Sequence, residues 1–296
     1  MARLEGSMVA IVTPLKNGAV DLKTLRELIE WQLTEGTDGI VPCGTTGEGA
    51  TLTPAERADV IRTTVETVRG RAAVIAGAGS NATHEAIESV KLAKELRADA
   101  ALVVTPYYNK PTQEGLYRHY VAIQEATRFP VIAYNVPGRT AVDLLPETVA
   151  RLAKARAIVG IKEATANMDR QVQLIERVGR DALAYLSGDD FTILPYIACG
   201  GHGVISVVAN VAPRATKDLV AAARRGDLSR ALDRQVALAE LNRMMFIETS
   251  PGPVKAAVAL LGKASSELRL PLAPLTDANL AKVRDAMVRF GLIQAV

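Results

Sequence analysis

The 296-residue chain has few of the residues that build disulfide frameworks or metal centres, with two cysteines and three histidines. Cys43 and Cys199 lie far apart, and His84, His119 and His202 are scattered without ligand-like spacing. Structural metal sites and disulfide-rich folds need regularly spaced ligands or cysteines. The sequence therefore predicts no metal site, no disulfide framework and a reducing compartment.

Long apolar runs and blocks of one charge are also absent. No segment reaches the roughly 18 to 20 consecutive apolar residues that span a bilayer. The start, MARLEGSMVAIVTP, has too short an apolar run for a signal peptide. The 35 Lys and Arg are interspersed with 32 Asp and Glu, and the net charge is +3. We expect a soluble, cytoplasmic protein with no nucleic-acid or membrane partner.

Eight short apolar runs, each bounded by Gly, Pro, Asp or Asn, alternate with amphipathic stretches of helical length. The runs are nearly continuously apolar, as strands of a parallel sheet covered on both faces are. One helix opens with Thr53-Pro-Ala-Glu56, which combines an N-cap, a proline at the first helical position and a capping-box glutamate. The predicted strands span residues 7–15, 38–44, 72–79, 100–106, 130–136, 158–164, 183–189 and 203–209.

Eight strands, each followed by a helix, are the number needed for a closed (β/α)8 TIM barrel over residues 1–225. A doubly wound sheet would show fewer strands and a glycine-rich phosphate turn after the first one, which this sequence lacks. Residues 226–296 carry only helical patterns. The sequence thus predicts an α/β protein, with a catalytic barrel and a small C-terminal helical domain packed on it.

Functional side chains of such barrels lie where strands end and βα loops begin. The residues at these positions share the ability to bind carboxylates or move protons. They are Thr45 and Thr46 in GTTGEG, Tyr107 and Tyr108 in TPYYNKP, Tyr134 and Arg139 in YNVPGRT, Lys162 in VGIKEAT, and the SGDD segment at 187–190.

The central residue of this set is Lys162, which ends an apolar run where a buried strand is expected. Desolvation lowers the pKa of such a lysine, and a neutral amine can form a Schiff base with a ketone. A phenol such as Tyr134 can transfer the protons that this step needs. The glycine-rich loop at Thr45 can direct N–H groups to one carboxylate, and Arg139 offers a fork for a second. The set suits a class I aldol-type reaction on an α-keto acid.

Each of these residues also has a structural interpretation. Lys162 alone could reach solvent or pair with Glu163, and the tyrosines could be packing residues. Lys255 lies in a similar apolar segment, GPVKAAVALLG, and we expect it on a helix surface. The convergence of the whole set on one rim favours a functional site.

The motifs GTTGE at 44–48, Y-N-x-P at 134–137 and G-x-K-E at 160–163 occur together in one family. The chain resembles the dihydrodipicolinate synthase (4-hydroxy-tetrahydrodipicolinate synthase) family of the N-acetylneuraminate lyase superfamily. The likeness runs from GSMVAIVTP through VTPYYNKPTQEGLY, LSGDD and GGHGVISV to the C-terminal helices.

The resemblance implies a Schiff-base lyase of lysine and diaminopimelate biosynthesis that joins pyruvate to L-aspartate semialdehyde. Lys162 would form the imine with pyruvate, with no other cofactor, and Tyr134, Thr45 and Tyr108 would relay protons. Tyr108 would reach into a neighbouring subunit of a homotetramer, a dimer of tight dimers. The substrate-binding residues implied are Thr45, Thr46, Arg139 for the semialdehyde carboxylate, and the backbone near Gly188 and Ile205.

Many bacterial members of this family bind lysine as a feedback inhibitor at the tight-dimer interface. The corresponding residues would be Gly49, Ala50, Pro54, Arg57, Asn81, Glu85 and Tyr107. Pro54 and Arg57 stand where lysine-sensitive members often carry histidines or another aromatic. Arg57 would bring a cation near the ammonium groups of the inhibitor, so we expect weak or absent inhibition.

Two alternatives remain at this point. Another pyruvate-dependent class I lyase of the superfamily, such as N-acetylneuraminate lyase or a 2-keto-3-deoxy-sugar acid aldolase, would share Lys162, Tyr134 and Thr45. Only Arg139 and the Tyr107–Tyr108 region speak against it. A more distant alternative is a non-catalytic ligand-binding barrel, which would have no need of an imine-forming amine.

Overall fold

Eight parallel strands close into a barrel in the computed structural model, which describes residues 4–295. Around the barrel they follow the order β1-β10-β9-β8-β7-β6-β5-β4. The predicted (β/α)8 fold is confirmed, and each strand lies inside its predicted segment or begins within one residue of it. The strands are β1 Gly6–Ala10, β4 Gly39–Val41, β5 Ala73–Gly77, β6 Ala100–Val104, β7 Val131–Asn135, β8 Gly160–Glu163, β9 Ala184–Ser187 and β10 Gly203–Ser206.

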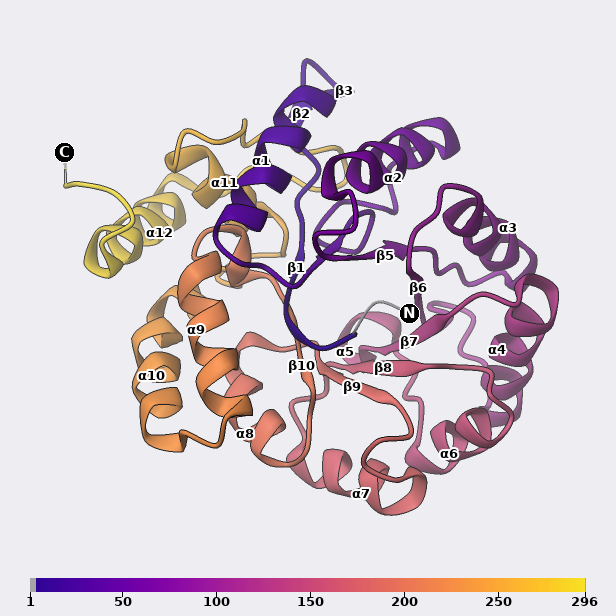
Figure 1. Cartoon of the computed structure of the whole chain (residues 1–296). Helices are drawn as coiled ribbons and strands as arrows, with labels where there is room; N and C mark the ends of the chain where they lie inside the picture. Colours follow the sequence, from indigo (N-terminus) through magenta and orange to yellow (C-terminus); the bar gives the residue numbers. More distant parts are fainter. Residues whose placement is uncertain (1–3, 296) are drawn as a thin grey trace.

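Helices surround the barrel as an outer ring (Figure 1). α2 begins with the predicted capping box, in which Thr53 and Glu56 each accept a hydrogen bond from the other's backbone N–H. The ring consists of α1 Leu22–Thr34, α2 Pro54–Val68, α3 Thr83–Glu95, α4 Gln113–Thr127, α6 Pro146–Lys154, α7 Met168–Val178, α8 Ile193–Ala198 and α9 Pro213–Arg224.

Five short elements within residues 4–295 were not predicted. A hairpin of β2 Leu15–Lys16 and β3 Ala19–Val20 follows β1, and the four-residue helix α5 Pro137–Thr140 follows β7. Two 3-10 turns, Asp190–Thr192 and Val208–Asn210, follow β9 and β10. α5 carries Arg139, so one of these elements belongs to the predicted site.

Side chains alternate between two cores along the strands, as the pleat requires. An inner core fills the barrel and includes Met8, Ile75, Tyr134, Leu186 and Ile205. A larger outer core lies between the strands and the helical ring. On β8, Lys162 lies on the inner side and Glu163 on the outer side, so the two neighbours are separated by the sheet itself.

The three C-terminal helices, α10 Leu228–Met244, α11 Gly252–Leu260 and α12 Asp277–Phe290, contribute to the outer core. Gln235 and Asn242 of α10 donate hydrogen bonds to the carbonyl oxygen of Asp190, in the 3-10 turn after β9. The domain boundary after residue 225 remains an interpretation of the sequence pattern. Of the helices in the described part of the chain, none has the length and apolar character needed to cross a membrane.

One expectation about the C-terminal region is wrong. Lys255, expected on a helix surface, is 1% exposed and forms an ion pair with Glu48. Lys255 reaches the GTTGEG loop and the segment after β1, which a local helical pattern does not reveal.

Candidate active site at the carboxyl end of the barrel

Lys162 and Tyr134 lie side by side inside the barrel. They occupy paired positions of the adjacent parallel strands β8 and β7. The Lys162 Nζ atom lies 4.2 Å from the centroid of the Tyr134 ring, and the two residues are 5% and 7% exposed. Within residues 4–295, no carboxylate lies within ion-pair distance of Lys162. The amine is therefore held in a mainly apolar place beside a phenol.

Gly188 is required by the path of the Lys162 side chain. A Cβ at position 188 would lie 3.0 Å from Lys162 Cε and 2.8 Å from Ala164 Cβ, which leaves no room for a side chain. The predicted backbone contact near Gly188 thus borders the lysine directly. Ile205 lies on β10 in the same inner core.

Glu163 is not the partner of Lys162. Its carboxylate lies behind the sheet and accepts hydrogen bonds from Asn135 Nδ2, at 3.0 Å, and from the Thr165 N–H, at 2.8 Å. Burial raises the pKa of Glu163, and these two hydrogen bonds oppose the rise. The structural interpretation in which Lys162 pairs with Glu163 is wrong.

The GTTGEG loop forms a turn at the end of β4. The N–H of Glu48 donates to the carbonyl of Thr45, and the N–H of Gly49 donates to that of Gly44. In the described part of the chain, the N–H groups of Thr45 and Thr46 have no acceptor. Successive free N–H groups in a turn are a device for binding anions. A carboxylate fits this position.

Close packing explains the glycine at position 49 of this loop. A Cβ on Gly49 would come within 2.2 Å of the Cys43 carbonyl oxygen. Thr13, just beyond β1, donates from its hydroxyl to the Gly47 carbonyl at 2.7 Å. This hydrogen bond holds the loop against the segment that follows β1.

A cavity of about 530 Å³ opens at this rim, and part of each predicted set, catalytic and inhibitor-binding, lines it, whereas Lys162 is not among the lining residues. From the first set it is lined by Thr45, Tyr134 and Arg139; from the second, by Gly49, Ala50, Arg57, Glu85 and Tyr107. Arg139 is exposed, and its Nη2 donates to the Ser250 carbonyl at 3.3 Å. The remaining nitrogens of its guanidinium are available to a ligand in the cavity.

Tyr107 and Tyr108 differ in their placement. Tyr107 is 40% exposed and lines the cavity, whereas Tyr108 is 88% exposed and has a φ of +73°. A tyrosine in the left-handed region is uncommon. No contact within residues 4–295 brings the Tyr108 hydroxyl to Tyr134 or Thr45.

Arg57 occupies part of the predicted inhibitor pocket. Its Nη1 donates to the Gly77 carbonyl at 3.0 Å and its Nη2 to the Gly49 carbonyl at 2.7 Å. Glu85 accepts from the Ser80 hydroxyl at 2.7 Å. Of the other predicted residues, Pro54 begins α2, and the Asn81 carbonyl accepts from Asn109 Nδ2.

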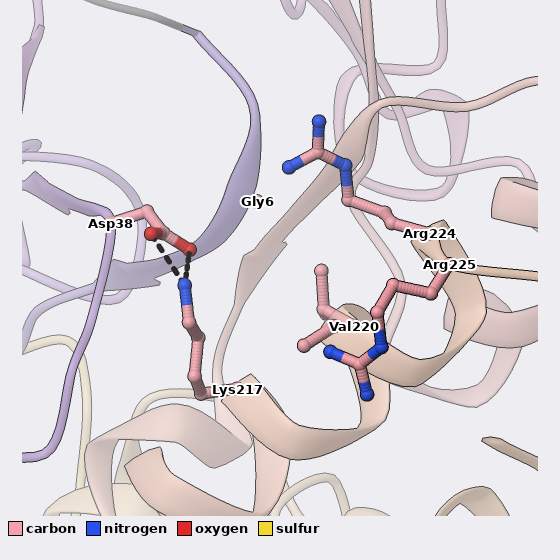
Figure 2. A pocket seen from close by; sticks show the side chains of 7 residues that line it. Gly6, Asp38, Lys217, Val220, Arg224 and Arg225 are labelled. Atoms are coloured by element: carbon pink, nitrogen blue, oxygen red, sulfur yellow. Dashed lines mark hydrogen bonds and ion pairs between the residues drawn. The ribbon is translucent and has the colours of Figure 1, made fainter. Parts of the chain in front are cut away.

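A second cavity, of about 330 Å³, lies at the opposite end of the barrel. Figure 2 shows Lys217 paired with Asp38 at this site, with Arg224 and Arg225 extending from the end of α9. Lys217 Nζ lies 2.5 Å from Asp38 Oδ1, and Arg224 pairs with Glu5 at 2.7 Å. These pairs join the barrel to α9, and this end is the one that confers stability in barrels of this type.

The metal-binding residue types do not cluster in the described residues, where no group of three or more His, Cys, Asp or Glu could hold an ion. Both cysteines are free thiols. Burial raises the pKa of Cys43 to about 12, so this thiol stays protonated.

Sequence reasoning missed Glu48 and Lys255 as part of the site. Glu48 lies inside the GTTGEG motif and is among the residues that line the cavity, and its carboxylate pairs with Lys255 of α11. The available signal was the charge of Lys255 in an otherwise apolar helix, which is the same signal that identified Lys162.

The fold and the site define a (β/α)8-barrel enzyme with a buried lysine at the carboxyl rim. The family model of the dihydrodipicolinate synthetase family matches residues 3–289. A 4-hydroxy-tetrahydrodipicolinate synthase of Anaeromyxobacter dehalogenans strain 2CP-C is 84% identical over 292 residues, 99% of each chain. One of Geobacter sp. strain M21 is 57% identical and covers 98% of this chain and 99% of its own.

A solved structure agrees with these relatives. The chloride-inhibited dihydrodipicolinate synthase from Acinetobacter baumannii, complexed with pyruvate, is 47% identical, with a TM-score of 0.96. The match covers 98% of this chain and 100% of that chain. The chain belongs to the dihydrodipicolinate synthetase family.

Proposed function

We propose that this protein is a lyase with 4-hydroxy-tetrahydrodipicolinate synthase activity, which condenses pyruvate with L-aspartate semialdehyde. The observation that carries the proposal is the buried Lys162 beside Tyr134 in a chain 84% identical to a synthase of that name. The complex of the Acinetobacter relative with pyruvate supports the first substrate.

Lys162 begins the reaction as a nucleophile. Its amine adds to the keto carbon of pyruvate, and the carbinolamine loses water to give an imine. Tyr134, next to the amine, moves the protons that addition and dehydration require. The imine withdraws electrons, so the pyruvate methyl group loses a proton and becomes an enamine carbon. That carbon attacks the aldehyde of the second substrate, and Thr45 and Tyr108 complete the proton relay.

The site binds two carboxylates, one from each substrate. The free N–H groups at Thr45 and Thr46 receive the carboxylate of pyruvate, and backbone groups near Gly188 and Ile205 line the site. Arg139 binds the carboxylate of L-aspartate semialdehyde. Cyclisation and release of the imine then restore Lys162, without any bound cofactor.

The other pyruvate lyases of the superfamily are the alternative that shares this chemistry. The relatives described above are named as synthases and not as these lyases. They match nearly the whole chain, at 84% and 57% identity. A non-catalytic barrel is disfavoured for the same reason. Arg139, positioned by α5 on the cavity wall, is the residue that separates the synthase from those lyases.

The proposal is tested by pyruvate consumption with L-aspartate semialdehyde, coupled to a reductase that follows the product through NADPH. We expect saturable turnover with this pair. Turnover only with N-acetylmannosamine or a sugar-derived aldehyde as the second substrate would contradict it.

We also propose a homotetramer, a dimer of tight dimers, acting in the cytoplasm in lysine and diaminopimelate synthesis. The exposed Tyr108, held in a left-handed conformation, is well placed to enter the site of a neighbouring subunit. Apolar side chains exposed on α10 offer a further surface for assembly.

Regulation by lysine is weak or absent in this proposal. The guanidinium of Arg57 donates hydrogen bonds to two carbonyl groups that line the pocket. A lysine ligand would bring its own cationic groups to the same place. Repulsion between these like charges opposes binding.

A further inference from the structure

Lys255, the second buried lysine among the described residues, is joined to the loop that carries Thr45 and Thr46. Its Nζ lies 2.5 Å from Glu48 Oε1 and donates to the Thr13 carbonyl at 3.1 Å. Both side chains of the ion pair are 1% exposed. Burial lowers the pKa of Lys255, and the hydrogen bond with Glu48 opposes this change. The pair therefore links α11, the segment after β1 and the GTTGEG loop, and both of its side chains are shielded from water.

The other oxygen of Glu48 is also used. Oε2 accepts from the N–H of Arg269 at 3.0 Å, and the Arg269 guanidinium donates to the carbonyls of Thr51 and Gly18. One carboxylate thus connects the loop to two separate parts of the C-terminal region.

The backbone conformation at position 48 is one that favours glycine over other residues. Glu48 has a φ of +53°, in the left-handed region, and lies between two glycines. A residue with a Cβ is disfavoured in this conformation relative to glycine. The chain carries a glutamate here nonetheless, with both of its oxygens bound.

A shift of Glu48 would move the predicted carboxylate site directly. The N–H of Glu48 donates to the Thr45 carbonyl at 3.1 Å, so the two residues close one turn. Thr13 contacts both the ion pair and the loop, because its carbonyl accepts a hydrogen bond from Lys255 and its hydroxyl donates one to the Gly47 carbonyl. The free N–H groups of Thr45 and Thr46 are held in direction by this turn.

We propose that the buried Lys255–Glu48 ion pair is a positioning device that sets the GTTGEG loop for the carboxylate of the keto-acid substrate. The inference rests on the proposed function, in which this loop receives pyruvate. The C-terminal helices thereby contribute to substrate binding without touching the substrate. A pair of apolar residues of equal size is often no less stable than a buried ion pair, which leaves loop geometry as the reason to keep the charges.

The test compares Lys255→Met with the double variant Lys255→Met/Glu48→Gln. The single variant leaves the Glu48 charge buried without its cation, so its melting temperature should fall. The double variant removes both charges, and the amide oxygen of the new glutamine side chain can still accept from the Arg269 N–H, so its melting temperature should recover. We expect the KM of the double variant for pyruvate to be about tenfold above that of the wild type, which corresponds to one weakened charge-assisted hydrogen bond. The kcat and the KM for the semialdehyde should change by less than about twofold, as for lost uniform binding.

A control pair with similar hydrogen bonds exists at the opposite end of the barrel, where its side chains are 29% and 32% exposed. Lys217 pairs with Asp38, whose Oδ2 accepts from the Ser7 N–H just as Glu48 accepts from Arg269. The variant Lys217→Met/Asp38→Asn should leave the KM for pyruvate unchanged. If the Lys255 variants do not fold, Glu48→Asp keeps both charges but shortens the link, and it should also raise this KM.

Borohydride trapping of pyruvate on Lys162 distinguishes a failure of the positioning role from a failure of the proposed function, because it needs no second substrate. We expect the half-saturating pyruvate concentration to rise in the double variant by the same factor as its KM. Wild-type saturation in the folded double variant, or in Glu48→Asp, would overturn the positioning role. A wild-type protein that traps no pyruvate would instead overturn the proposed function, and the positioning role with it.

Discussion

Two lysines lie buried in the part of the chain that the structure describes, and their neighbours give them different tasks. Lys162 faces a tyrosine ring at 4.2 Å and has no carboxylate partner within residues 4–295, whereas Lys255 is paired with Glu48. An amine that must attack a carbonyl cannot be held in an ion pair. We therefore assign nucleophilic chemistry to Lys162 alone.

Replacement of this nucleophile gives the first prediction. Lys162→Ala should lower turnover by roughly 10³-fold or more, because the covalent route is lost. The fold should persist, since a buried polar side chain is replaced by a small apolar one. Steady-state kinetics and circular dichroism check both points, and near-normal activity in this variant would rule the mechanism out.

The second prediction concerns the fork at the cavity wall. Arg139→Ala should raise the KM for L-aspartate semialdehyde by about 10- to 100-fold, the loss expected for a hydrogen-bonded charge pair. Imine formation with pyruvate precedes this contact and should be unchanged. A variant that loses pyruvate trapping but keeps semialdehyde affinity would contradict the assignment.

The third prediction concerns lysine as an inhibitor. Because Arg57 is bound to the carbonyls of Gly49 and Gly77 inside the pocket, lysine at low millimolar concentration should leave the wild-type rate unchanged. Arg57→His removes most of the fixed charge and should make inhibition easier to detect. Inhibition of the wild type at such concentrations, abolished by Glu85→Ala, would refute the proposal.

At the residue scale, local pattern revealed one buried lysine and missed the other. Lys162 is detectable because it ends a strand-like run, and parallel strands bring such ends to one rim. Lys255 pairs with a residue 207 positions away, and no pattern within α11 specifies that neighbour. For the same reason Glu48 reads as part of a glycine-rich turn, although its side chain faces α11.

At the scale of elements, α2 shows how one glutamate serves two purposes. Glu56 closes the capping box with Thr53 and also pairs with Arg269, whose Nη1 lies 2.7 Å away. The Arg269 guanidinium lowers the pKa of Glu56 from its ordinary 4.5 to about 2. The start of α2 is thus tied to the C-terminal region beside Glu48.

This pairing predicts a pH dependence. A carboxyl group with a depressed pKa stabilises the fold above its unfolded pKa, and that contribution disappears as pH falls from about 4.5 through about 2. Glu56→Gln keeps the capping box and should cost about 1–2 kcal/mol at pH 7, after allowance for partial solvent screening. The difference should shrink steadily below pH 4.5.

Urea unfolding at several pH values measures this difference. Glu240→Gln is the control, because its ion pair with Arg289 lies on the surface, with side chains 42% and 57% exposed. A pH-independent effect of Glu56→Gln would contradict the role given to its charge.

Most elements follow from sequence because they are long enough to show a period. The eight strands are apolar runs and the capped helices carry clear start signals, so both were predicted. α5 has four residues, too few for periodicity, and β2 and β3 have two each. The Asn17–Gly18 turn between β2 and β3 was a signal that could have been used, because both residues have positive φ, as a tight hairpin requires.

At the scale of the whole molecule, α10 exposes an apolar stripe at helical spacing. Leu228, Leu232 and Val236 are 51%, 54% and 65% exposed. Nearby, Phe191 and Phe246 contact each other and are 42% and 38% exposed. Monomeric proteins rarely leave such a patch uncovered.

The assembly prediction follows from this stripe. We expect a tetramer in solution. The variant Leu232→Glu/Val236→Glu should form dimers instead, because the tetramer interface would then bury unpaired charges. Analytical ultracentrifugation distinguishes the two species. A wild type that sediments as a monomer at micromolar concentration would contradict the proposal, as would a charged variant that stays tetrameric.

The central claim is that Lys162, among the lysines of this chain, forms a covalent imine with pyruvate. The most direct test is borohydride reduction of the wild-type protein with pyruvate, followed by peptide mass mapping. We expect one adduct, on Lys162, and none on Lys255, which is also buried. An unmodified protein, or an adduct on another lysine with Lys162 free, would contradict it.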